Sequence, residues 1–156
     1  YHCSSLKEIK INHKSEKIAS STFNGCLSLN HIIIPTSAKS IDFCAFYRCK
    51  SLTIVTIPSS IIKIDNNAFE ECSSLERVSF NTPYSIKSIG DFAFNGCSSL
   101  KEMTIPSTVV FIGKEVFAKC LSLKNLSVPF SININNIGIN QQVKLVRVVS
   151  NTINIF

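Results

Sequence analysis

The 156-residue sequence lacks most of the features that assign a protein to a functional class. It contains no run of 18 apolar residues, which excludes a transmembrane helix and membrane insertion. It contains no glycine-rich phosphate loop, no H-E-x-x-H and no G-x-S-x-G motif, so nothing in the sequence indicates an enzyme. The chain opens at Tyr1 without an initiator methionine or a signal peptide, and we expect it to be a fragment of a longer protein.

The residues that bind metals or nucleic acids are present, but not in the necessary patterns. The seven cysteines include no C-x-x-C pair, and no histidine stands beside a cysteine at ligand spacing, so we expect no zinc and no cofactor. The formal net charge is +6, but no aromatic residues interleave with the basic ones, and we expect no nucleic-acid partner. The positive charge still permits an acidic ligand such as a sulfated glycan.

A repeat of 23 residues organises the chain. Six of the seven cysteines recur at this interval, with one interval of 25, and each is followed three residues later by a leucine. A phenylalanine stands three residues before five of these cysteines. A fixed period of this length is typical of a solenoid, in which each unit buries its apolar side against its neighbours. The recurring cysteines are Cys3, Cys26, Cys49, Cys72, Cys97 and Cys120.

Each unit begins with a short run of alternating apolar residues, such as Val55 and Ile57. This period of two predicts a strand with one buried face, and the proline that follows in four units, as at Pro58, ends the strand. Apolar residues then recur three apart, and the run from Ala45 to Cys49 predicts one α-helical or 3₁₀ turn. We therefore predict an α/β repeat solenoid, with a parallel sheet on its concave face and helical turns on its convex face.

This pattern resembles the BspA-like leucine-rich repeat. The resemblance is carried by Leu52-x-x-Val55-x-Ile57-Pro58 with Phe69 and Cys72, and it recurs over roughly residues 3–130. It implies a leucine-rich-repeat horseshoe without catalytic residues. It also implies a secreted or cell-surface module that adheres to partner macromolecules, such as extracellular-matrix or host-surface proteins. The alternative function is an intracellular leucine-rich-repeat scaffold that binds a regulatory protein.

The recurring cysteines are better explained by packing than by bonding to one another. Equivalent positions in stacked coils lie about 5 Å apart, within reach of a disulfide, but their side chains point in parallel. We therefore predict a ladder of buried free thiols. Cys44 falls outside the repeat, at the position of Asn67 in the next unit. We expect it to be exposed and to be the reactive thiol if any is.

The outward-facing residues of the predicted strands form two columns across the concave face. One column includes an isoleucine next to a histidine and an arginine, and the other is rich in hydroxyl groups. Solvation alone does not require the apolar patch, so we predict that a protein partner contacts these columns. The candidate partner-binding residues are His31, Ile33, Ile54, Thr56, Arg77, Ser79, Glu102 and Thr104.

Two further positions are candidate sites. One unit carries two extra residues near 81–84, and insertions in solenoids form loops that often have a function. We expect this loop to project Tyr84 at an edge of the array. Asn125-Leu126-Ser127 is a possible glycosylation sequon within a predicted strand.

The repeat decays towards the C-terminus. We divide the chain into an array of about six coils, residues 1–142, and a degenerate terminal coil or cap, residues 143–156. An asparagine-rich stretch from Ser131 to Gln142 replaces the Ala-Phe turn. The segment from Val143 to Val149 resembles one more strand, and 153–155 is expected to add a final β segment.

Overall fold

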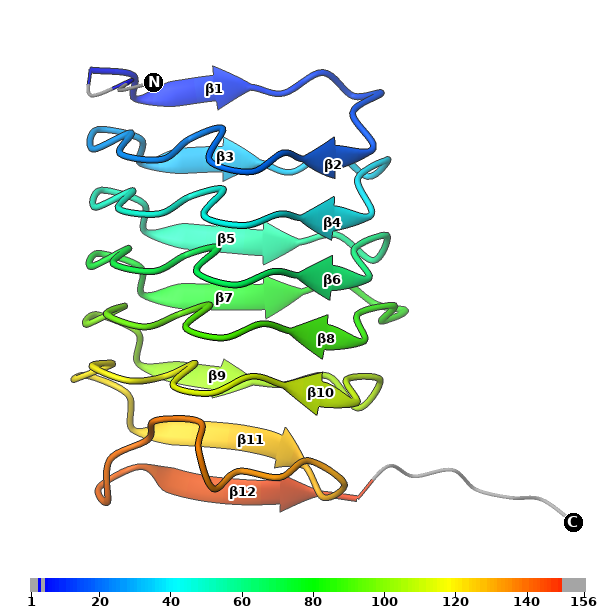
Figure 1. The fold of residues 1–156 in the computed structure, drawn as a ribbon, viewed down its shortest axis with the longest axis vertical. Helices are drawn as coiled ribbons and strands as arrows, with labels where there is room; N and C mark the ends of the chain where they lie inside the picture. The colour runs from blue at the N-terminus through cyan, green and yellow to red at the C-terminus, as the bar shows by residue number, and fades with distance from the viewer. Residues whose placement is uncertain (1–2, 4, 150–156) are drawn as a thin grey trace, which may run out of the picture.

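The computed structural model describes residues 3 and 5–149, and its strands are arranged in two rows along one stack of coils (Figure 1). The first row contributes one strand per coil, and its outward surface is called the long-strand face below. The first six of these strands each begin five residues after the recurring cysteine, where the apolar alternation predicts them. They are β1 (Glu8–Lys10), β3 (His31–Ile33), β5 (Ile54–Ile57), β7 (Arg77–Phe80), β9 (Glu102–Thr104), β11 (Asn125–Pro129) and β12 (Lys144–Val148).

The second row is a continuous parallel sheet of five two-residue strands. Its order is β10-β8-β6-β4-β2, and each strand is in register with its neighbour one coil away, as Ile41 is with Ile64. This sheet could not be predicted from the sequence, because a strand of two residues is too short to show a period of two. These short strands are β2 (Lys17–Ile18), β4 (Ser40–Ile41), β6 (Lys63–Ile64), β8 (Ser88–Ile89) and β10 (Phe111–Ile112).

The core fills the space between the two rows of strands. The inward residues of the long strands are buried as predicted, including Val55 and Ile57, and they pack against the inward isoleucines of the short strands. At the turns, five phenylalanine rings stack in one column with centroid distances from 5.1 to 6.1 Å. One side chain per coil thus repeats at the coil spacing, and the array has a single continuous core.

The predicted helical turns are wrong, because the described residues contain no helix. In each turn the N–H groups alternate between two directions: Ala45 N donates to Asp42 O in the same coil, whereas Phe46 N donates to Ala68 O in the next. Residues with positive φ, such as Cys44 at 53°, accompany this alternation. An α-helix would need successive N–H groups to bond four residues back. The fold is therefore a parallel β-solenoid of about six turns.

The predicted ladder of free thiols is confirmed. Of the six recurring cysteines, all are free, five are buried and Cys3 is half-buried; the buried ones are Cys26, Cys49, Cys72, Cys97 and Cys120. Four of them donate a hydrogen bond to the phenylalanine carbonyl of the preceding coil, as Cys72 Sγ does to Phe46 O at 3.1 Å. The same carbonyl accepts the N–H of Cys49 in its own coil. The thiol therefore occupies the core as a small apolar group and supplies one bond between coils.

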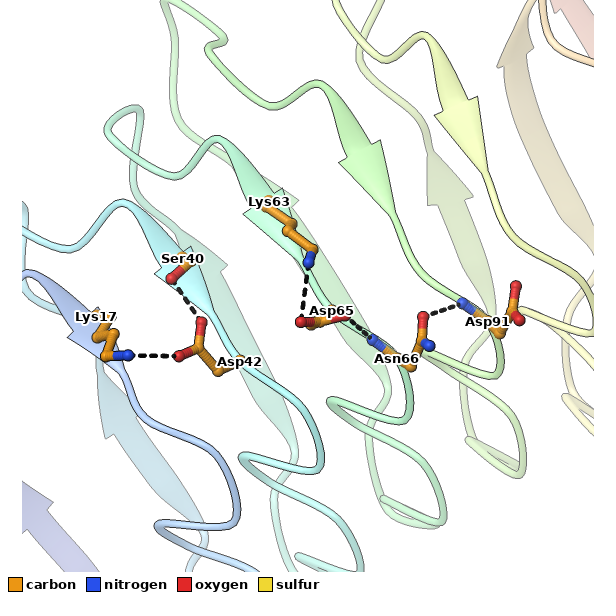
Figure 2. Close-up of polar contacts among 7 residues, drawn as sticks. All are labelled: Lys17, Ser40, Asp42, Lys63, Asp65, Asn66 and Asp91. Carbon is orange, nitrogen blue, oxygen red and sulfur yellow. Dashed lines mark hydrogen bonds and ion pairs between the residues drawn. The ribbon is translucent and has the colours of Figure 1, made fainter.

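Polar side chains beside the short strands connect neighbouring coils (Figure 2). Asn66 Oδ1 accepts the N–H of Asp91 at 2.9 Å, and Asp91 Oδ1 accepts the N–H of Lys114 at 3.0 Å. The residue before each of these donors is a glycine, Gly90 or Gly113. A Cβ at Gly113 would lie 2.4 Å from both Asp91 Oδ1 and Asp91 N. Glycine is therefore needed where the preceding coil places such a side chain.

We expect Gly113→Ala to lower the free energy of unfolding by about 1–3 kcal/mol, because the new methyl group must displace Asp91 or its backbone. Urea unfolding followed by circular dichroism measures this change. Ser107→Ala, an exposed substitution in the same part of the chain, is the control and should stay within about 0.5 kcal/mol. Equal stabilities of the two variants would contradict the proposed need for glycine.

The last coils differ from the others. No short strand occurs among the described residues after β10, where the asparagine-rich stretch lies. The strand predicted over 143–149 is confirmed by β12, which pairs in parallel with β11 from Lys144 to Val148. Ile153 and Ile155, predicted to add a β segment, lie outside the described residues. The division into an array and a terminal coil stays a prediction.

Candidate binding face

All eight predicted partner-binding residues lie on the long-strand face. The parallel register places Ile54 beside Arg77 and Thr56 beside Ser79, and the Oγ atoms of this second pair are 3.3 Å apart. Seven of the eight side chains are exposed, and Ser79 is half-buried. The predicted columns therefore exist in the structure. The strand period and the repeat length were sufficient to find them, since both are set by backbone geometry.

The hydrogen-bonded ladder of this face is interrupted at two places. The long strands form three separate sheets: β1-β3, β5-β7 and β9-β11-β12. At both interruptions the backbone hydrogen bond directly before the later strand is long: Thr53 N donates to Asn30 O before β5, and Lys101 N to Glu76 O before β9, each at 3.5 Å. Each interruption borders a hollow in the surface of the long-strand face.

The first hollow lies between β3 and β5 and has a volume of about 280 Å³. Ile33 and Ile54 are 66% and 47% exposed at its border, which is a large exposure for two adjacent isoleucines. His31 and Thr56 border the same hollow, so four of the predicted residues meet there. The remaining lining is Ile32, Ile34, Thr36, Pro58 and Asn81.

The second hollow lies between β7 and β9 and has a volume of about 400 Å³. It contains Tyr84 together with Arg77 and Glu102. Two predictions that the sequence treated separately, the strand columns and the inserted loop, therefore meet in one place. Ser79 and Thr104, also predicted, line the hollow too, whereas Val78, Phe80, Met103 and Pro106 were not predicted, because the sequence pointed only to an irregular coil with a 25-residue interval. The complete lining is Arg77, Val78, Ser79, Phe80, Tyr84, Glu102, Met103, Thr104 and Pro106.

Four ion pairs are found among the described residues, and none of their members lines either hollow. Lys17 pairs with Asp42 at 3.2 Å, and Lys63 with Asp65 at 2.9 Å, both beside the short strands (Figure 2). Two more pairs join neighbouring coils elsewhere: Arg48 with Glu71 at 2.8 Å and Lys101 with Glu76 at 2.7 Å. The hydrogen bonds from these cations lower the pKa values of Glu71 and Glu76. Arg77 and Glu102 belong to none of the four pairs found among the described residues.

The predicted sequon residue Asn125 is exposed on β11, in the column that also contains Glu102 and Lys144. A glycan attached there would stand on the long-strand face. Its modification stays a prediction.

The described residues offer no arrangement for metal or thiol chemistry. No group of three or more His, Cys, Asp or Glu side chains within residues 3 and 5–149 is placed to hold a metal ion. Cys44 is half-buried rather than exposed, and burial and the nearby charge of Glu70 raise its pKa, which disfavours the nucleophilic thiolate. Nor do these residues contain a helix that could span a bilayer.

Two solved structures share this architecture. A leucine rich cell surface protein from Faecalibacterium prausnitzii A2-165 is 33% identical with a TM-score of 0.71, and the match covers 81% of this chain and 34% of that one. A leucine rich repeat protein from T. pallidum is 26% identical with a TM-score of 0.73, covering 84% and 62% of the two chains. The chain thus spans less than two thirds of either relative's length. No curated protein is similar enough to count as a match.

The repeat unit itself matches a known family. The BspA type leucine rich repeat region matches residues 1–84 and 77–141, with six copies. This range includes every complete coil, the inserted loop and both hollows. The chain belongs to the BspA type leucine-rich-repeat family.

Proposed function

We propose that this chain is a non-enzymatic module that binds a partner protein through its long-strand face, in a secreted or cell-surface protein. The observation that carries this proposal is the exposed pair Ile33 and Ile54 beside the first hollow. A sheet face that met only water would not need two neighbouring exposed isoleucines. The leucine-rich repeat is a protein-interaction fold, and the F. prausnitzii relative is described as a cell surface protein, which supports the proposed role and location.

The first hollow has the features of a small binding hot spot, namely an apolar centre and polar side chains at its rim. An apolar side chain of the partner would enter between Ile33 and Ile54, while His31 and Thr56 would meet polar groups at the rim. The strands are held by a continuous core, so little conformational entropy is lost when the partner binds. Adhesion in this view needs no chemistry beyond the presentation of a rigid surface.

The double variant Ile33→Asp/Ile54→Asp tests the proposal. Two carboxylates at the rim would have to be desolvated by an apolar partner group, so we expect partner capture to fall at least about tenfold. The immobilised chain is incubated with a surface-protein extract and a cytosolic extract of cultured epithelial cells, and captured proteins are quantified by mass spectrometry. Circular dichroism should remain unchanged, because both positions are exposed.

The matched control is Val110→Asp, which places the same charge at a 74% exposed position outside the long strands. It should capture the same protein as the unaltered chain. Capture that is equal in all three forms would refute the role of the hollow. A specific partner found only in the cytosolic extract would instead favour the scaffold function.

A further inference from the structure

We propose that the second hollow, between β7 and β9, is a binding site for a neutral saccharide. This site is distinct from the apolar hollow of the proposed protein contact and does not depend on it. Its defining side chains are Tyr84, Arg77, Glu102 and Thr104. They come from two strands and the inserted loop, and they meet only because the solenoid stacks these coils.

The hydrogen-bonding groups of the hollow are complementary to a sugar. Arg77 can only donate, Glu102 can only accept when ionised, and the Thr104 hydroxyl can do both. Neighbouring hydroxyls of a sugar ring both donate and accept, so one ring can satisfy such a set. Neither charged group is engaged in an ion pair or side-chain hydrogen bond with the described residues, which leaves both available to a ligand.

The tyrosine supplies the apolar part of the site. Tyr84 is 39% exposed, and it lines the hollow together with Phe80 and Pro106. A tyrosine ring presents an apolar body and a polar tip, which suits the C–H face and the hydroxyl edge of a sugar. The two-residue insertion that distinguishes this coil is what places the aromatic ring beside the strand columns.

Charge and shape select a neutral ligand. The hollow contains one cation and one anion, Arg77 and Glu102, so its charges sum to zero. Because these charges cancel, a sulfated glycan would gain no net Coulomb attraction in the hollow, whereas a neutral sugar can use both groups as hydrogen-bond partners. A volume of about 400 Å³ is within the usual range for small-ligand sites. Between β7 and β9 the interrupted ladder also leaves backbone N–H and C=O groups for bridging water or ligand.

The test uses saturation-transfer difference NMR and calorimetry with four neutral disaccharides: cellobiose, maltose, lactose and chitobiose. A heparin-derived sulfated disaccharide is the comparison. We expect at least one neutral disaccharide to bind with a Kd in the millimolar range or tighter. Tyr84→Ala should weaken that binding at least tenfold. Phe43→Ala, which removes an exposed aromatic ring outside both hollows, is the matched control and should leave it unchanged.

The variant Glu102→Gln tests whether the carboxylate charge, apart from the shape of the hollow, selects a neutral ligand. It should weaken binding of the neutral disaccharide at least threefold and strengthen binding of the sulfated one, because the repulsive carboxylate is gone. Absence of binding by all four neutral sugars, binding that Tyr84→Ala leaves intact, or binding of the sulfated disaccharide alone would overturn the proposal. Ile33→Asp/Ile54→Asp should retain saccharide binding, so failure here is distinguishable from failure of the protein-binding proposal.

Discussion

Replacing Phe69 with alanine is expected to lower the free energy of unfolding by about 3–5 kcal/mol. The Phe69 ring is fully buried and stacks between Phe46 and Phe94, with centroid distances of 5.1 and 5.4 Å. Its loss would leave a cavity at the centre of the column. The neighbouring rings cannot close this cavity, because the coil spacing is set by the hydrogen bonds of the turns, such as Phe46 N to Ala68 O.

Urea unfolding followed by far-ultraviolet circular dichroism measures this loss. Domains of this size have a total stability of about 5–15 kcal/mol, so a large part of it would disappear. The matched control is Phe43→Ala, since Phe43 is 49% exposed and should change the stability by no more than about 0.5 kcal/mol. If the two variants were equally stable, the phenylalanine column would not be the main support of the stack.

The ladder thiols are expected to resist alkylation in the native protein. Burial raises the pKa of Cys49 and of Cys120 from 9.0 to about 12. At pH 8 a rise of about three units lowers the thiolate fraction roughly 1,000-fold, and burial also blocks the reagent. Cys44 has a raised pKa as well, but it is only half-buried and should react far sooner than the ladder thiols.

Mass spectrometry of peptides after iodoacetamide treatment compares the native and urea-unfolded chains. All seven cysteines should be labelled after unfolding, and labelling of Cys49 at the rate of Cys44 in the native chain would contradict the buried ladder. The same pKa shift has a consequence for stability. The folded state keeps its thiols protonated above pH 9, where the unfolded thiols ionise, so stability is fully present below about pH 9 and falls as the pH rises towards about 12.

The long-strand face could be predicted because it depends on local rules. Alternation at Val55 and Ile57 identifies the buried side of a strand, and the 23-residue period places equivalent residues side by side. The cysteine ladder follows from the same period. Each of these inferences needs only the pleat of a strand and the stacking of identical units.

The turns could not be predicted in the same way. The Ala45–Cys49 spacing suits a helical turn, but the chain uses positive φ at Cys44 and bonds between coils instead. A hydrogen bond to the next coil has no signal within one unit, because its acceptor lies more than 20 residues away. The short-strand sheet escaped prediction for the same reason, since its two-residue strands exist only through pairing with neighbouring coils.

The sequence by itself determined the period, the buried side chains, the columns of the long-strand face and the family. Only the tertiary structure decided that the sheet is interrupted after β3 and β7 and that these interruptions open into hollows. It also brought Tyr84 into one hollow with Arg77 and Glu102. The physical reason is that a repeat specifies which residues are equivalent, whereas the fit between successive coils depends on how every side chain packs at once.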